Sequence, residues 1–184
     1  VDNLDLYKQL RLTDDDNPNF DYRCIETDIN PFTLYLGNTV HSNVLRLYNY
    51  NSSSVDPVNI GIIENTTLEL FNCTGTFNLS SYGYGSVVLI KNCQDLTISN
   101  IGSGVSLIIE NSNVGLPTKN IGSLSLKDSN VYNGTITCDS FGCYSSILST
   151  AINCKGCVIK DSQLNAAINQ TINGITSTFI DNNI

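Results

Sequence analysis

The chain of 184 residues has no Met, no Trp, a single His and only nine Lys and Arg together. Charged residues make up 14% of it, which is too few for a helical bundle, while 41% hydrophobic residues exclude a disordered chain. The net charge of −8 includes no basic stripe that could neutralise phosphates, so we expect no nucleic-acid partner. The longest apolar run, Val87 to Ile90, is far too short for a bilayer, so we also expect no membrane span.

Asn, Ser and Thr are abundant instead, with 25, 20 and 16 residues. Seven Cys are more than a reducing cytosol usually leaves without a metal or redox task. Because the sequence begins at Val1 with no leader, we interpret it as a mature secreted chain with an extracellular or cell-surface location. Six sequons are candidates for N-linked glycans: Asn51, Asn65, Asn72, Asn78, Asn133 and Asn169.

A short motif, apolar-x-apolar-x-Asn/Asp, recurs along the chain. Its strict copies end at Asp14, Asn38, Asn49, Asn72, Asn92, Asn100, Asn111 and Asp128. From Asn72 through Asn92 and Asn111 to Asp128 the intervals are 20, 19 and 17 residues. This period is typical of a coil of β-strands in which each period forms one turn of the coil. Asn tolerates the left-handed backbone of a sharp corner, and amides stacked at ~4.8 Å can bond from turn to turn. We therefore predict an asparagine ladder of these four residues.

With its Leu/Ile/Val rows and terminal asparagines, the chain resembles the right-handed parallel β-helix proteins, the pectate-lyase-like solenoids. The resemblance covers 58–184 well and 32–57 weakly. It implies an all-β fold, a parallel β-helix (β-solenoid) over 32–184, after an irregular acidic extension, 1–31, that can serve as a subunit-contacting arm. The alternative is an antiparallel β-sandwich, in which Asn133-Gly134 and Asn173-Gly174 form hairpin turns.

The cysteines follow the same period. Cys73 and Cys93 each come directly after a ladder residue, which would place them on neighbouring turns within disulfide range. We predict three disulfides, namely Cys73 with Cys93, Cys138 with Cys157, and Cys143 with Cys154, and Cys24 is left over. Two alternatives stay open for the last four cysteines: local pairs, Cys138 with Cys143 and Cys154 with Cys157, or a zinc knot of all four.

Most enzymes of the resembled fold cleave acidic polysaccharides with an Arg or Lys base beside Ca²⁺-binding Asp, or with clustered Asp and a His. Residues 58–184 contain no Arg and no His, and His41 precedes the clear repeats. The carboxylates of the repeats stand singly, at Asp95, Glu110, Asp128, Asp139, Asp161 and Asp181. We therefore predict a protein that is not an enzyme and has no cofactor.

Metal binding has one weak candidate, the acidic run Asp14, Asp15 and Asp16, which offers oxygen ligands for Ca²⁺. This run lacks the Gly and the spaced Glu of an EF-hand loop, so a solvated acidic turn is the preferred interpretation and no metal site is predicted.

The end of the chain predicts the function. Residues 176–184 still have the pattern of a coil turn, and an open β-coil end needs a cover. We predict an extracellular structural protein that forms a homopolymer, assembling end to end into a surface filament or sheath. One alternative is a carbohydrate-binding or adhesin module, with Tyr82, Tyr84, Tyr132 and Tyr144 stacking on sugars; another is a polysaccharide lyase or hydrolase.

Overall fold

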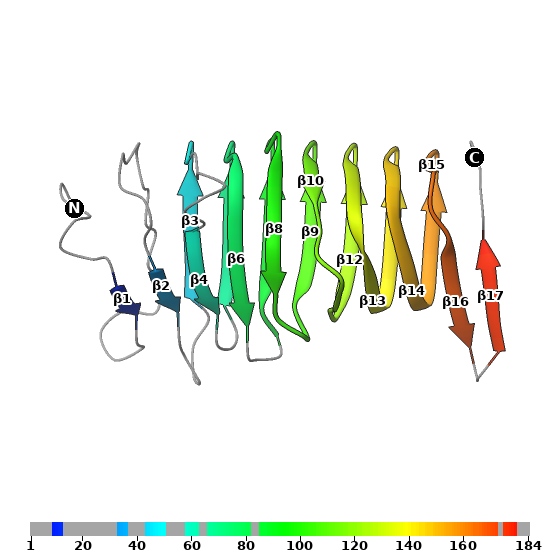
Figure 1. The fold of residues 1–184 in the computed structure, drawn as a ribbon, viewed down its shortest axis with the longest axis horizontal. Helices are drawn as coiled ribbons and strands as arrows, with labels where there is room; N and C mark the ends of the chain where they lie inside the picture. Colours follow the sequence, from blue (N-terminus) through cyan, green and yellow to red (C-terminus); the bar gives the residue numbers. More distant parts are fainter. Residues whose placement is uncertain are drawn as a thin grey trace.

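The protein is an all-β coil of parallel strands with about six turns, seen here in a computed structural model. The structure describes residues 9–12, 33–36, 43–50, 58–62, 66–81, 85–172 and 175–179. Its strands stand side by side along the long axis, with β1 (Gln9–Leu12) and β17 (Ile175–Phe179) at opposite ends (Figure 1). None of the described residues belongs to a helix that could cross a membrane.

Each turn contributes strands to three faces, which we number in chain order. The first face consists of β3 (Asn43–Tyr48), β5 (Thr66–Phe71), β7 (Val87–Lys91), β9 (Ser106–Glu110), β12 (Ser123–Lys127) and the segments 140–144 and 156–160. Every neighbouring pair on this face is parallel and in register. It carries the apolar-x-apolar motif that the sequence repeats.

The second face is short and follows the corner after the motif. It contains β10 (Asn113–Gly115), β15 (Gln163–Leu164) and the first residues of β6 (Gly75–Ser81) and β8 (Leu96–Ile101). The third face contains β1, β2 (Thr33–Leu36), β4 (Val58–Ile62), β11 (Lys119–Asn120), β16 (Ile168–Ile172) and the rest of β6 and β8. β13 (Asn130–Tyr144) and β14 (Ile147–Lys160) each pass round all three faces.

The core is the interior of the coil. On the first face the inward positions form two rows. One of these rows contains Leu70, Ile90, Ile109 and Leu126, none of which has exposed surface. Burial alternates along these strands, because successive side chains of a strand point to opposite faces. This stacking confirms the predicted parallel β-solenoid, and the β-sandwich alternative is wrong.

Turn length decreases along the chain. Corner residues Asn49 and Asn72 are 23 residues apart, whereas Ser146 and Ser162 near the other end are 16 apart. The later turns are shorter because β13 and β14 turn their corners without intervening loops. Asn133-Gly134, a hairpin turn in the sandwich alternative, is a bulge inside β13, where the register with β14 shifts between Tyr132 and Thr135.

The C-terminal end differs from the prediction. The segment that was expected to form another parallel turn, 176–184, contributes instead to β17, which pairs antiparallel with β16. Ile172 lies opposite Ile175 in this pair, with Asn-Gly between them in the sequence. Asn-Gly favours a tight two-residue hairpin turn, and this local preference overrides the weak repeat. The chain therefore folds back on the third face.

At the other end, β1 falls within the predicted extension 1–31 and pairs in parallel with β2. The Ca²⁺ candidates Asp14, Asp15 and Asp16 lie outside the described residues, as do Cys24 and His41.

Candidate functional site

The corner between the first and second faces is a column of residues with left-handed backbone. Its members are Asn49, Asn72, Asn92, Asn111, Asp128, Ser145 and Asp161, whose φ angles lie between 46° and 55°. Asn and Asp adopt this conformation more readily than other residues with a Cβ, which explains their place at the end of each motif. Ser145 is the member that the sequence pattern did not reveal.

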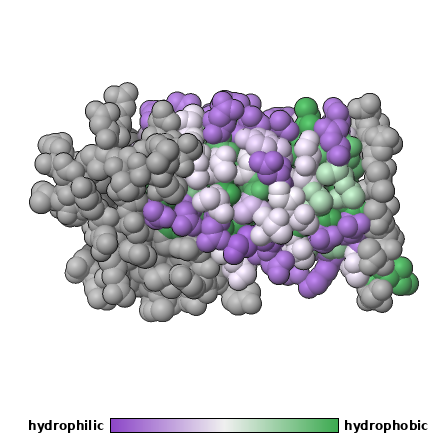
Figure 2. All heavy atoms as spheres, viewed as in Figure 1, coloured by the Kyte–Doolittle hydropathy of each residue, from purple (hydrophilic) through white to green (hydrophobic). Residues whose placement is uncertain are grey.

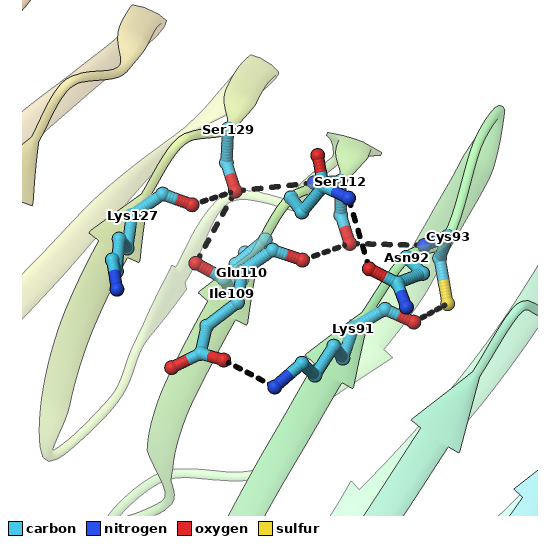
Figure 3. Close-up of polar contacts among 9 residues, drawn as sticks. Lys91, Asn92, Cys93, Ile109, Glu110, Ser112, Lys127 and Ser129 are labelled. Atoms are coloured by element: carbon cyan, nitrogen blue, oxygen red, sulfur yellow. Dashed lines mark hydrogen bonds and ion pairs between the residues drawn. The ribbon is translucent and has the colours of Figure 1, made fainter.

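Hydrogen bonds join parts of this column. Asn72 Nδ2 donates to Asn49 Oδ1 at 2.7 Å, and Asn111 Nδ2 donates to Asn92 Oδ1 at 2.9 Å. Figure 3 labels Asn92, which accepts the second of these bonds. Asp128 follows Asn111 in the column, and a carboxylate accepts hydrogen bonds but donates none. The four predicted ladder residues therefore share one corner, with an amide pair at Asn92 and Asn111.

Directly after each corner residue from Asn72 onward lies a second, buried column. It consists of Cys73, Cys93, Ser112, Ser129, Ser146 and Ser162. The hydroxyl of Ser129 donates to the carbonyl of Lys127 at 2.7 Å and accepts from the backbone N–H of Ser112 at 3.2 Å (Figure 3). The same pattern repeats at the other serines. It satisfies backbone groups that the corner leaves without a strand partner.

Cys73 and Cys93 continue the serine column with sulfur. The backbone N–H of Cys73 donates to Cys93 Sγ at 3.3 Å, and each thiol donates to the carbonyl two residues earlier at 3.4 Å. Both are free thiols in this structure. The hydrogen bond to Cys93, together with burial, raises the pKa of Cys73. Cys73 and Cys93 are therefore neighbours on successive turns, as predicted, and their thiols make the same kinds of hydrogen bonds as the serine hydroxyls of this column.

The other predicted cysteine pairs do not match the register. Cys138 lies opposite Cys154, and Cys143 lies opposite Ile159 rather than facing another cysteine. The physical reason is the shorter turn of 16 residues at this end, where the prediction assumed 19. All four are free thiols. No group of three or more His, Cys, Asp or Glu side chains among the described residues could hold a metal ion, which contradicts the zinc-knot alternative.

A shallow groove of about 280 Å³ follows the corner over three turns. It is lined by Gln94, Asn111, Ser112, Asn113, Asp128, Ser129, Asn130, Ser145 and Ile147. Asn130 Nδ2 donates to Asn113 Oδ1 at 3.0 Å along its floor. Amides, hydroxyls and one carboxylate therefore offer both donors and acceptors to solvent here.

The carboxylates of the repeats are dispersed over different corners and rows. Glu110 pairs with Lys91 at 3.1 Å, and Asp139 pairs with Lys155 at 2.6 Å. The hydrogen bond from Lys155 to Asp139 raises the pKa of this lysine. Asp128 has Asn111 and Ser145 as its neighbours in the corner column. The structure therefore brings none of these three carboxylates against another one, while Asp181 lies outside the described residues.

The two described tyrosines of the proposed sugar-stacking group lie on different faces. Tyr144 ends the last-but-one strand of the first face, and Tyr132 belongs to the second face. Each ring lies near a glycine, because a Cβ added to Gly142 or Gly115 would meet it at 3.2 Å or 3.0 Å. Tyr82 and Tyr84 are outside the described residues.

The candidate glycosylation sites differ in their surroundings. Asn133 is exposed, at φ 66° in the bulge of β13. Asn72 is exposed in the corner column. Asn78 and Asn169 are half-buried, and their Nδ2 groups donate to Asn59 at 2.8 Å and Asn153 at 2.9 Å. Asn51 and Asn65 lie outside the described residues.

Exposed apolar surface gathers at the C-terminal end. The large hydrophobic side chains that are exposed in the described part are Tyr144, Ile147, Val158, Ile172 and Ile175. Figure 2 shows hydrophobic residues gathered toward this end of the described turns. Segment 156–160, the last strand of the first face, pairs with β13 on one side, and no described strand lies on its other side. Its inward-facing Cys157 and Ile159 are only partly buried.

The fold and these features define a parallel β-solenoid with an asparagine corner. Comparisons with protein-family models, with curated proteins and with solved structures each found no match.

Proposed function

We propose that the protein is a non-enzymatic structural β-solenoid of the cell exterior that associates end to end with further copies of itself. The observation that carries the proposal is that exposed apolar side chains gather at the C-terminal end, near a strand edge that no described strand covers. Val158, Ile172 and Ile175 are 56%, 54% and 73% exposed. A single exposed apolar side chain is ordinary, but apolar side chains that gather at one end of a molecule are typical of an interaction surface.

This edge, which has no partner among the described strands, supports a second copy as the partner. Segment 156–160 has the apolar-x-apolar alternation of every other strand on the first face, so a strand with that same alternation can add to it in register. The other end of the coil supplies parallel strands of the same spacing, and its first described strand, β1, has β2 as its only described partner. Contact between opposite ends is heterologous and therefore continues into an open filament.

The right-handed form of the coil, N-linked glycans and secretion belong to the same proposal. An outer surface rich in Asn, Ser and Thr, with six sequons, suits a protein that carries glycans outside the cell. The free thiols need no disulfide to hold the turns together, because the corner columns already bond turn to turn.

Sedimentation velocity over a range of concentrations, with negative-stain imaging, tests the association. We expect concentration-dependent oligomers and linear particles for the unmodified chain. Val158→Lys combined with Ile175→Lys places charges on the exposed end and should leave monomers. Thr137→Lys, an exposed position on the third face, is the matched control and should still assemble. A monomeric unmodified chain at all concentrations would refute the proposal.

The corner groove favours a second candidate function, carbohydrate binding. Its amides and the Asp128 carboxylate can exchange hydrogen bonds with sugar hydroxyls along three turns. Titration calorimetry with neutral and acidic oligosaccharides tests this candidate. Binding that is abolished by Asn130→Ala and unaffected by Thr137→Ala would support it, and the absence of heat with every sugar would exclude it.

A further inference from the structure

Two cysteines stack on one another in the last turns of the coil. Cys138 in β13 and Cys154 in β14 are register partners on the third face. Each is only 4% exposed, whereas their chain neighbours Thr137, Asp139 and Lys155 are exposed, as the alternation of a strand requires. The two cysteine side chains therefore belong to one inward row, on successive turns.

The register brings no other two cysteines of the described strands together. Cys143 lies opposite Ile159, and Cys157 lies opposite Phe141. The sequence had suggested other partners for both members of the pair, because the turn is shorter here than the motif spacing on which the prediction relied. The pair is therefore a product of the fold.

The spacing of the strands places the pair within reach of a disulfide. Neighbouring strands of a sheet lie about 4.8 Å apart, and a disulfide accepts Cα separations of roughly 4.4–6.8 Å. Two register partners on the same side of a sheet satisfy this range. Burial, together with the nearby Cys154 and Asp139, raises the pKa of Cys138 to about 12, so the closed coil keeps this thiol protonated.

We propose that Cys138 and Cys154 are a modification site, at which a small-molecule disulfide oxidises them to an intramolecular disulfide between successive turns. The bond closes one complete turn into a covalent ring, which runs from the third face round the first and second faces and back. Such a ring restricts the unfolded chain and so favours the folded coil. Only the oxidising surroundings that the bond needs in the organism rest on the proposed location outside the cell.

Oxidation accompanies folding or a local opening, because both thiols are buried in the closed coil. β16 covers β14 only at Ile152, Asn153 and Cys154, so its detachment uncovers Cys154. The Cys154 thiolate then attacks the oxidant RSSR, forms a mixed disulfide with one SR group, and releases RS⁻. The Cys138 thiolate attacks the Cys154 sulfur, which forms the Cys138–Cys154 bond and releases the second RS⁻. The two cysteine protons end on the two RS⁻ groups, so two thiols are oxidised while one RSSR is reduced to two RSH.

Oxidative refolding with peptide mapping tests the proposal. A chain carrying Cys24→Ser is unfolded in urea and refolded with glutathione and glutathione disulfide, and its remaining thiols are alkylated. Trypsin and chymotrypsin then put each of the last four cysteines on its own peptide, by cleavage after Tyr132, Phe141, Tyr144 and Lys155. We expect a disulfide that links peptide 133–141, which contains Cys138, to peptide 145–155, which contains Cys154.

Four single variants assign the partners. We expect the link in the matched controls Cys143→Ser and Cys157→Ser, and its loss in Cys138→Ser and Cys154→Ser. Alanine at the last two positions repeats the test with a different side chain, and circular dichroism shows that each variant is folded. The urea midpoint should be higher for the oxidised than for the reduced chain, and the two midpoints should coincide in Cys154→Ala. The proposal is overturned if no such link forms with glutathione disulfide in excess, if Cys138 or Cys154 is joined to another cysteine instead, or if oxidation leaves the urea midpoint unchanged.

Discussion

Asn111 donates a hydrogen bond from its Nδ2 to Oδ1 of Asn92, one turn away at the same corner, at 2.9 Å. Both residues have left-handed backbone, with φ of 46° and 55°. The same residue type thus supplies the backbone bend and the bond between turns, so the two contributions can be separated by substitution.

Asn111→Ala removes the amide and places an ordinary side chain at positive φ. We expect a loss of about 1–2 kcal/mol in the free energy of unfolding from these two effects. Asn111→Gly removes the amide but tolerates the backbone, and should lose distinctly less. Urea denaturation of both variants measures the difference. Equal losses would show that the backbone conformation contributes nothing here.

Ser129 sits in the buried column and accepts from the N–H of Ser112. Ser129→Ala leaves that buried N–H without its acceptor, at an expected cost of about 1–3 kcal/mol. Ser129→Cys should lose less, because Cys93 already holds the equivalent place and accepts from Cys73 at 3.3 Å. Thermal unfolding of the two variants ranks them, and a more stable Ala variant would contradict the role given to this column.

Ser145 is the corner residue with the least suitable side chain, at φ 48° between Asp128 and Asp161 in the column. Ser145→Asn introduces a residue that prefers this backbone and can donate to Asp128, so we expect a gain of about 0.5–1 kcal/mol. Ser145→Ala is the control and should not stabilise. The urea midpoints of the two variants measure this gain, and a midpoint for Ser145→Asn no higher than that for Ser145→Ala would contradict the prediction.

Alkaline pH should destabilise the fold through its buried thiols. The pKa of Cys138 is raised to about 12 and that of Cys154 to about 11, so both stay protonated in the folded chain where the unfolded chain ionises. Stability is therefore full below the ordinary thiol pKa and falls as pH rises from about 9 toward these values, by up to about 1.4 kcal/mol per pH unit for each group. Urea unfolding of the reduced protein across this range measures the slope. Cys138→Ala should reduce it.

N-glycosylation in a eukaryotic secretory host should discriminate between the sequons. Asn133 is exposed in the bulge of β13. The next residue, Gly134, packs closely against the preceding turn, because a Cβ added to it would meet the backbone oxygens of Leu116 and Pro117 at 2.5 Å. Asn78, by contrast, is half-buried with its amide bonded to Asn59. We expect a glycan at Asn133 and none at Asn78, as mapped by glycopeptide mass spectrometry. Occupancy of Asn78 alone would contradict this order.

Sequence reasoning found the coil because its signal is local and repeated. The apolar alternation determines which side chains point inward, and Asn at each corner marks where the backbone turns. The interval between corners was readable as far as Asp128, where the motif is strict. Beyond it Ser145 replaces Asn at the corner, so the turn of 16 residues was hidden. The positions predicted to face Cys138 and Cys143 therefore differ from those in the register, whereas Cys73 and Cys93 are neighbours as predicted.

The sequence by itself determined an all-β chain, the parallel coil and its corner residues, since periodicity of two along a strand and a recurring bend leave few other ways to bury the apolar rows. Only the tertiary structure decided which residues meet between turns. In the structure Cys138 lies opposite Cys154, and the backbone N–H of Ser112 donates to the hydroxyl of Ser129. Strand β17 pairs antiparallel with β16. These contacts depend on the register between neighbouring turns, because a slip of one residue along a strand would move all of its side chains to the opposite face.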